Sequence, residues 1–138
     1  MGDHTAIVTG ANHGIGAATA VALARRGCAV LCTFFQIEDP PDDGIPQAYR
    51  DQRAGDADGV VTQIRRDGGR ALAVEADLSD AATPTALFDA AEEQLGPVDI
   101  LVNNASGWLA DTFGAAGPDR LGRSLRPVTE ATWGQQFR

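Results

Sequence analysis

Three glycines stand close together near the start of the chain, in the segment 9–16, which reads Thr-Gly-Ala-Asn-His-Gly-Ile-Gly. A short apolar run precedes them and an alanine-rich stretch follows. Between a strand and a helix, Gly10 permits a tight turn, Gly14 lets the backbone approach a pyrophosphate, and Gly16 lets the helix pack closely on the sheet. The free N–H groups and the dipole at the start of that helix favour a bound anion. The segment therefore predicts a phosphate-binding loop, with a purely structural turn as the alternative.

Polar residues follow two later apolar segments at corresponding positions. Asp77-Leu78 comes directly after residues 71–76, and Asn103-Asn104-Ala105-Ser106 comes directly after residues 98–102. If both segments are strands of a parallel sheet, these residues lie at its carboxyl edge, where open α/β sheets bind ligands. The carboxylate can accept hydrogen bonds, and the amides can both donate and accept them. A solvated acid at a strand end and an ordinary asparagine-rich turn are the alternatives.

The pattern Thr-Gly-x-x-x-Gly-Ile-Gly, followed by these two motifs in this order, resembles the short-chain dehydrogenase/reductase family. The resemblance implies that Asp77 accepts from the adenine amino group of a nicotinamide cofactor. It also implies that the turn at Asn104 borders the cofactor ribose and steadies the central sheet. Serine stands at Ser106, where the family usually has glycine. The residues expected to bind the cofactor are Gly10, Asn12, His13, Gly14, Ile15, Gly16, Phe34, Phe35, Asp77, Leu78, Asn104, Ala105 and Ser106.

The resemblance further implies an activity, the interconversion of a carbonyl and an alcohol by hydride transfer with NADP or NAD. It implies a small-molecule substrate and a homo-oligomer, either a tetramer or a dimer. In the family a tyrosine, its pKa lowered by a neighbouring lysine, acts as the general acid–base. This sequence has no lysine, its one tyrosine is Tyr49, and neither Ser106 nor Ser124 matches the place of the family's serine. We therefore predict no catalytic residue within the chain.

Two main functional interpretations remain open, with a third that the motifs disfavour. The first is the nucleotide-binding N-terminal part of such an oxidoreductase, ending within a helix that begins after Thr129. The second is a non-catalytic nucleotide-binding or complementation module, suggested by the missing catalytic pair. A methyltransferase with a glycine-rich loop is a distant third, disfavoured by the motifs at Gly14 and Asn103.

The choice between NADP and NAD depends on the end of the second predicted strand. An acid about 20 residues beyond the glycines normally accepts from the ribose 2′-OH and selects NAD. Phe34-Phe35-Gln36 occupies this place instead, so a 2′-phosphate would not be repelled. His13 stands where NADP-using relatives often have arginine or lysine, and Arg50 or Arg53 could also reach the phosphate. We therefore expect NADP to be preferred over NAD.

Alternating strands and helices must position these residues. Apolar runs predict strands over 6–8, 29–35, 71–76 and 98–102, and periodic apolar residues predict helices after the first three of them. The first helix covers 15–26 and ends at Gly27, the second ends at Gly68-Gly69, and the third has Thr83 as its N-cap and Pro84 at its first position. Residues 36–58 are predicted to be a surface insertion and 107–128 to be mostly loop. The fold class is α/β, an incomplete Rossmann-like doubly wound parallel sheet in one domain over residues 1–138.

Composition limits the possible partners. The 138 residues carry 19 acidic and 11 basic side chains, a formal net charge of −8, which disfavours nucleic acid and anionic membrane surfaces. We see no targeting segment and expect a cytoplasmic protein. Cys28 and Cys32 would lie about 13 Å apart on a strand, too far for a disulfide or a shared metal, so no metal site is predicted. The fourth strand would leave Val98, Ile100 and Val102 on an exposed hydrophobic edge.

Overall fold

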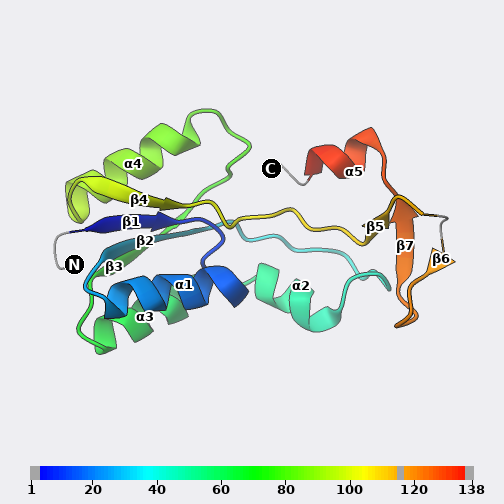
Figure 1. Ribbon diagram of the computed structural model, residues 1–138, viewed down its shortest axis with the longest axis horizontal. Coiled ribbons are helices and arrows are strands. Elements are labelled where there is room, and N and C mark those ends of the chain that lie inside the picture. The colour runs from blue at the N-terminus through cyan, green and yellow to red at the C-terminus, as the bar shows by residue number, and fades with distance from the viewer. Residues whose placement is uncertain (1–3, 115–116, 136–138) are drawn as a thin grey trace.

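The computed structural model describes residues 4–114 and 117–135. Its main sheet has four parallel strands in the order β3-β2-β1-β4. Helices α1 (Gly14–Arg25) and α3 (Asp58–Arg66) cover one face, and α4 (Thr83–Gln94) covers the other (Figure 1). This arrangement confirms the predicted Rossmann-like α/β fold class. The strands are β1 (Thr5–Val8), β2 (Ala29–Phe34), β3 (Ala71–Glu75) and β4 (Val98–Val102).

The core lies in two layers because side chains of a strand alternate between its two faces. On β2, Val30 and Cys32 pack with α1 and α3, while Leu31 packs with Leu87 and Ala91 of α4. Strands β1 and β2 are buried along their whole length, which explains why their sequences are apolar except for Thr5 and Thr33 and do not alternate.

Two predicted helix starts have different outcomes. The assignment of Thr83 as an N-cap is wrong by one position, because Ala82 is the N-cap and Thr83 is the first helical residue. The Thr83 hydroxyl instead donates to the Asp77 carbonyl at 2.6 Å. Helix α5 (Glu130–Gln135) does begin after Thr129, whose hydroxyl oxygen accepts from the Thr132 N–H at 3.2 Å. This contact satisfies one of the N–H groups left free at a helix start.

The predicted insertion at 36–58 is more ordered than its loop-like composition suggests. It contains helix α2 (Gln47–Arg53), and Ile45 and Ala57 are buried. The Ile37 N–H donates to the Arg53 carbonyl at 3.1 Å, so the two ends of this stretch lie side by side. Four glycines and two prolines predicted loop over 107–128, but the segment also forms the short strands β5 (Asp111–Thr112), β6 (Gly117–Pro118) and β7 (Ser124–Pro127).

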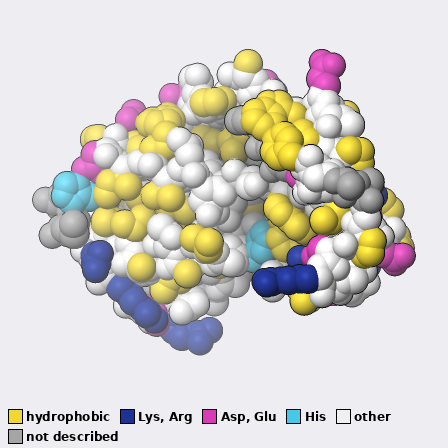
Figure 2. Space-filling model, turned by 45° about the vertical axis from the view of Figure 1, so that its right-hand side comes forward, with side chains coloured by type: hydrophobic (Ala, Val, Ile, Leu, Met, Phe, Trp, Pro, Cys, Tyr) yellow, Lys and Arg dark blue, Asp and Glu magenta, His cyan; other side chains and the backbone are white. Residues whose placement is uncertain are grey.

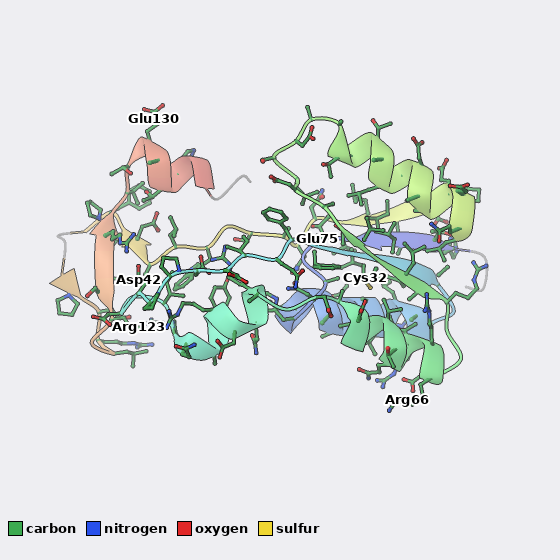
Figure 3. All side chains as sticks on the ribbon, turned by 180° about the vertical axis from the view of Figure 1, so that it is seen from behind. Cys32, Asp42, Arg66, Glu75, Arg123 and Glu130 are labelled. Carbon is green, nitrogen blue, oxygen red and sulfur yellow. The ribbon has the colours of Figure 1, made fainter. Side chains whose placement is uncertain are left out.

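The short strands lie well away from the main sheet. Two extended segments, after β2 and after β4, run side by side from the main sheet toward them (Figure 1). At that end Asp42 forms an ion pair with Arg126, which ties the first segment to β7. Figure 3 shows Asp42 and Arg123 together there, with Cys32 in the main sheet and Arg66 on the outer side of α3. Among the described residues, no helix is both long and apolar enough to cross a membrane.

Candidate functional site

A cleft of about 690 Å³ opens at the carboxyl ends of the four parallel strands. The surface is hollowed between the main sheet and the part that carries α5 (Figure 2). The cleft volume is in the range of small-molecule and cofactor sites. Every residue predicted to bind the cofactor lines the cleft except Gly16. The lining also includes Thr33, Ile37, Tyr49, Gln52, Arg53, Ala76, Ser79 and Gly107.

Gly16 contributes by packing and not by lining the cleft. A Cβ on Gly16 would lie 2.1 Å from the Gly10 carbonyl oxygen and 2.5 Å from Asn104 Nδ2. Any side chain at this position would therefore push α1 away from the turn that follows β4. Gly16 thus holds the helix start against the sheet, as the spacing of the glycines predicted.

Gly14 has the opposite environment. Its φ is +57°, and a Cβ placed on it would have no heavy atom within 4 Å apart from its chain neighbours and the backbone of its own helix. The start of α1 at this point has no side-chain cap, because the N-cap residue His13 makes no capping hydrogen bond. Neighbouring Ile15 is 79% exposed. A helix start with N–H groups free of side-chain caps, next to open space, fits a phosphate group.

Thr9 and Asn104 join the glycine loop to the turn after β4. The Thr9 hydroxyl oxygen accepts from the backbone N–H groups of Asn104 and Ala105, each at 2.9 Å. In return, Asn104 Nδ2 donates to the carbonyl oxygens of Thr9 and Gly10 at 3.0 and 3.1 Å. Thr9 is buried, so these contacts replace hydrogen bonds to water. The Asn104 side chain is therefore committed to holding the loop, while Ala105 and Ser106 face the cleft.

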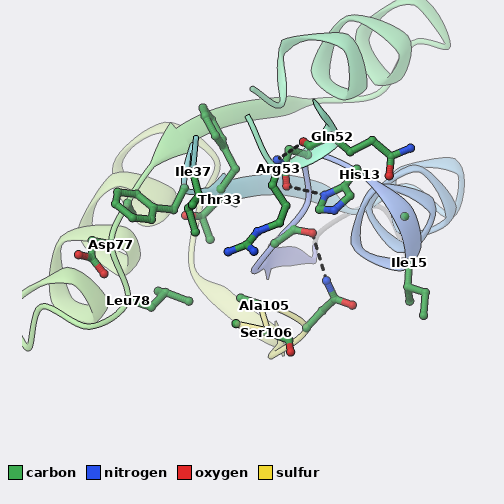
Figure 4. A pocket seen from close by; sticks show the side chains of 18 of the residues that line it. His13, Ile15, Thr33, Ile37, Gln52, Arg53, Asp77, Leu78, Ala105 and Ser106 are labelled. Atoms are coloured by element: carbon green, nitrogen blue, oxygen red, sulfur yellow. Dashed lines mark hydrogen bonds between the residues drawn. The ribbon is translucent and has the colours of Figure 1, made fainter. Parts of the chain in front are cut away.

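The Asp77-Leu78 motif forms the far rim of the cleft. Asp77 and Leu78 lie on the opposite side of the pocket from His13 and Ile15 (Figure 4). The Asp77 Oδ1 atom accepts from the Ser79 N–H at 2.9 Å, which fixes the orientation of the carboxylate. A carboxylate held in this way can accept a hydrogen bond from an amino group in the cleft.

Helix α2 adds residues that the motifs did not identify. Asn12 Nδ2 donates to the carbonyl oxygens of Gln52 and Gly55 at 3.2 and 2.9 Å, which holds the end of α2 against the glycine loop. The Tyr49 ring lies 5.7 Å from the His13 ring and 5.5 Å from the Trp108 ring, the latter edge to face. Gln52 and Tyr49 had no motif to mark them, since their approach to the cleft depends on how residues 36–58 fold.

The cleft contains one of the two arginines that the sequence offered in this region. The Arg53 side chain points into the pocket and is only 6% exposed (Figure 4). Its Nη1 lies 2.9 Å from Asp39 Oδ2, and its Cζ lies 5.7 Å from the centre of the Tyr49 ring. Arg50 is not part of the lining and donates to Gln47 Oε1 at 2.7 Å.

His13 faces the same cleft but carries little positive charge. Burial, and then the nearby Arg53 guanidinium, lower the pKa of His13 below its ordinary value of 6.5. The imidazole is therefore mostly neutral at pH 7, and a neutral ring offers one N–H donor but no charge. Burial likewise raises the pKa of the Cys32 thiol to about 12, so this cysteine is an inert part of the core.

Comparison with protein families identifies one match. The sequence model of the family described as short chain dehydrogenase matches residues 41–119, more than half of the chain. This stretch contains both polar motifs and α2. The matched stretch does not contain the glycine loop, whose likeness to a phosphate-binding loop rests on the geometry of Gly14 and Gly16.

Individual relatives agree with the family match. An uncharacterised oxidoreductase of Methylorubrum extorquens is 44% identical over 100 residues, which are 72% of this chain and 34% of the relative. Versicolorin reductase of Emericella nidulans is 38% identical over 128 residues, which are 90% of this chain and 41% of the relative. The chain thus spans well under half the length of these two curated relatives.

Solved structures share the fold. A dehydrogenase/reductase from Sinorhizobium meliloti 1021 superposes with a TM-score of 0.67 at 33% identity, over 98% of this chain and 42% of that one. A blue fluorescent protein from a metagenomic library, solved in complex with NADPH, gives a TM-score of 0.64 at 32% identity, over 96% of this chain and 43% of that one.

Proposed function

This chain belongs to the short-chain dehydrogenase/reductase family of oxidoreductases, and from that premise we propose that it forms the NADP- or NAD-binding part of an enzyme that interconverts a carbonyl and an alcohol. The bound cofactor supplies or accepts the hydride. The residues of this chain bind and orient the dinucleotide. The observation that carries the proposal is the single cleft in which the glycine loop, the Asp77 motif and the Asn104 turn meet.

Each part of the cleft has a proposed role. The start of α1 binds the pyrophosphate through N–H groups at Gly14 and Ile15, with Gly10, Asn12 and His13 completing the loop. Phe34 and Phe35 lie beside the adenosine ribose, and Asp77 and Leu78 bind the adenine. The turn formed by Asn104, Ala105 and Ser106 borders the second ribose.

NADP is the proposed preferred cofactor. No acid stands at the end of β2, where Phe34 and Phe35 occupy the position that would accept from a ribose 2′-OH in an NAD enzyme. The structural relative solved with NADPH supports a nicotinamide cofactor of this kind.

The chain contributes binding and no acid–base pair. It has no lysine, and its one tyrosine, Tyr49, lies on α2. We assign the catalytic tyrosine and lysine, the substrate pocket for a small carbonyl or alcohol, and the contacts of a homo-oligomer to a longer polypeptide that includes this chain. Its proposed location is the cytoplasm. A non-catalytic nucleotide-binding or complementation module is the second candidate, favoured by the same missing pair, and hydride transfer by the full-length protein would exclude it.

Two glycine variants test the proposed phosphate site. Gly14 and Gly68 both have positive φ, +57° and +85°, and an added Cβ would find no heavy atom within 4 Å at either position. Alanine at each site therefore carries a similar backbone cost, about 1 kcal/mol. Only Gly14→Ala places a methyl group in the cleft. We expect Gly14→Ala to weaken both NADPH and NADH at least about tenfold by equilibrium titration of the full-length protein, by blocking close approach of the pyrophosphate.

Gly68→Ala is the matched control, because Gly68 lies beyond α3 and outside the cleft lining. Gly68→Ala should bind both cofactors with wild-type affinity, although it should lose about as much stability as Gly14→Ala does. Wild-type affinity in the Gly14 variant would place the phosphates elsewhere, and a wild-type protein that binds neither cofactor would overturn the proposed function.

A further inference from the structure

Arg53 is the one arginine in the lining of the cleft, within the part of the chain that the structure describes. It belongs to α2, in the segment between β2 and α3, and not to any of the three motifs that define the nucleotide site. A buried guanidinium is costly unless charged or hydrogen-bonding partners surround it. Arg53 therefore calls for an explanation beyond packing.

The contacts of Arg53 leave part of its hydrogen-bonding capacity unused. Its Nη1 is buried and makes no hydrogen bond to any described residue, although Asp39 Oδ2 lies 2.9 Å away. The pair is thus an electrostatic contact without hydrogen-bond alignment. Asp39 is not part of the cleft lining, whereas the Arg53 side chain points into the pocket (Figure 4). The cleft side of the guanidinium can receive an anion while Asp39 holds the group in place.

The position of Arg53 selects among the phosphates of a dinucleotide. Its carbonyl accepts from the Ile37 N–H at 3.1 Å, which places Arg53 just beyond the end of β2. In doubly wound folds this is the place where the 2′ position of the adenosine ribose is read, while the pyrophosphate lies at the first helix. His13, the other candidate there, has its pKa lowered by burial and by Arg53, and it is mostly neutral at pH 7.

Taking the proposed nucleotide site as given, we propose that Arg53 binds the 2′-phosphate of NADP and sets the preference for NADP over NAD, with Asp39 as a positioning residue. A guanidinium can donate two parallel hydrogen bonds to a phosphate, which a lysine ammonium cannot match. The positive charge that distinguishes NADP from NAD thus comes from Arg53 on α2 and not from the glycine loop.

The test measures binding and needs no turnover. In the full-length protein, Arg53→Met should weaken NADPH about 10- to 100-fold, the range expected for one charge-assisted contact, and leave NADH little changed. Adenosine 2′,5′-bisphosphate and 5′-AMP, as fragments with and without the 2′-phosphate, should show the same contrast. Arg53→Lys should fall between wild type and Arg53→Met for NADPH. Arg50→Met is the matched control on the same helix and should alter neither cofactor.

Every outcome bears on the proposal. An equal loss of NADPH and NADH in Arg53→Met would assign Arg53 to the pyrophosphate or to the fold, and unchanged NADPH affinity would remove it from recognition; either result overturns the inference. If Arg53→Met unfolds because Asp39 is left unpaired, the double variant Arg53→Met/Asp39→Asn removes both charges and takes its place. Wild-type binding that is lost in Gly14→Ala but unaffected in Arg53→Met would leave the proposed function standing and reject Arg53 alone.

Discussion

Thr9 shows how one side chain can hold two distant parts of the site together. Its hydroxyl oxygen accepts two backbone N–H groups from the turn after β4, and its own backbone begins the glycine loop. The Thr-Gly pair of the sequence motif therefore does more than open a turn. The glycine loop and the turn at Asn104 form one hydrogen-bonded unit, so a substitution that displaces one of them also displaces the other.

Thr9→Val tests this unit by replacing the Thr9 hydroxyl with a methyl group. Valine keeps the shape of threonine but cannot accept a hydrogen bond, so the N–H groups of Asn104 and Ala105 lose their partner. We expect unfolding by urea to show a loss of about 1–3 kcal/mol, the cost of buried donors left unsatisfied. NADPH and NADH should weaken together. Thr9→Ser retains the hydroxyl and should stay near wild type; similar stability for the two variants would contradict this account.

Helix α2 depends on contacts with its neighbours for stability. It has seven residues, a length at which an isolated helix is not stable in water. Asn12 binds the carbonyl oxygens of Gln52 and Gly55 at its carboxyl end, where backbone acceptors have no partner within the helix. The glycine loop therefore fixes the position of α2, and with it the position of Arg53.

Asn12→Asp should loosen α2. The carboxylate has nearly the same shape as the amide but donates no hydrogen bond, and it would face two carbonyl oxygens. We expect faster amide hydrogen exchange over residues 47–55. Relative to the wild type, the affinity for NADPH should fall more than the affinity for NADH, since Arg53 moves with the helix. Asn103→Asp is the control, because Asn103 is exposed and outside the cleft lining. Unchanged exchange over α2 would show that other contacts hold it.

The elements also show what the sequence can predict. The four strands and their three helices were predicted to within a few residues, because β1 and β2 are almost entirely apolar and the helices have periodic apolar faces. The residues of the three motifs were brought to one cleft because each follows a parallel strand. Helix α2 could not be predicted, since its seven residues are mostly polar, follow a segment of prolines and acids, and show no helical repeat of apolar side chains. The role of Tyr49 depends on that helix, so no local signal marked it, and the sequence could name Arg50 or Arg53 as able to reach a phosphate but could not choose between them.

On the scale of the whole molecule, the sheet has an uncovered side at β4. Within residues 4–114 and 117–135, this strand pairs with β1 alone. Leu101 is 48% exposed, whereas Val98, Ile100 and Val102, which were predicted to form the exposed edge, are half-buried against the core. Figure 2 shows hydrophobic side chains uncovered over the part of the molecule that carries the main sheet. Unpaired backbone groups beside apolar side chains make a strand edge prone to pairing with another chain.

Residues 1–138 expressed alone should therefore self-associate. We expect multi-angle light scattering to give masses above the 14.4 kDa of one chain, increasing with concentration. Leu101→Lys places a charge on the edge and should shift the population toward the monomer. Leu121→Lys, which alters a similarly exposed leucine far from β4, is the control and should not. A monodisperse monomer of the unmodified chain would contradict this expectation.

The hydrogen bond between Ile37 and Arg53 also has a consequence for how such a protein can change. This hydrogen bond joins the two ends of a loop that begins after β2. The entropic cost of closing a loop between fixed ends grows only slowly with the length of the loop. We therefore expect the stretch between β2 and α3 to tolerate replacement by a segment of different length or sequence. Replacing it with the corresponding connection of another family member would leave the sheet and the glycine loop in place and would transfer the choice of dinucleotide separately from the capacity to hold one.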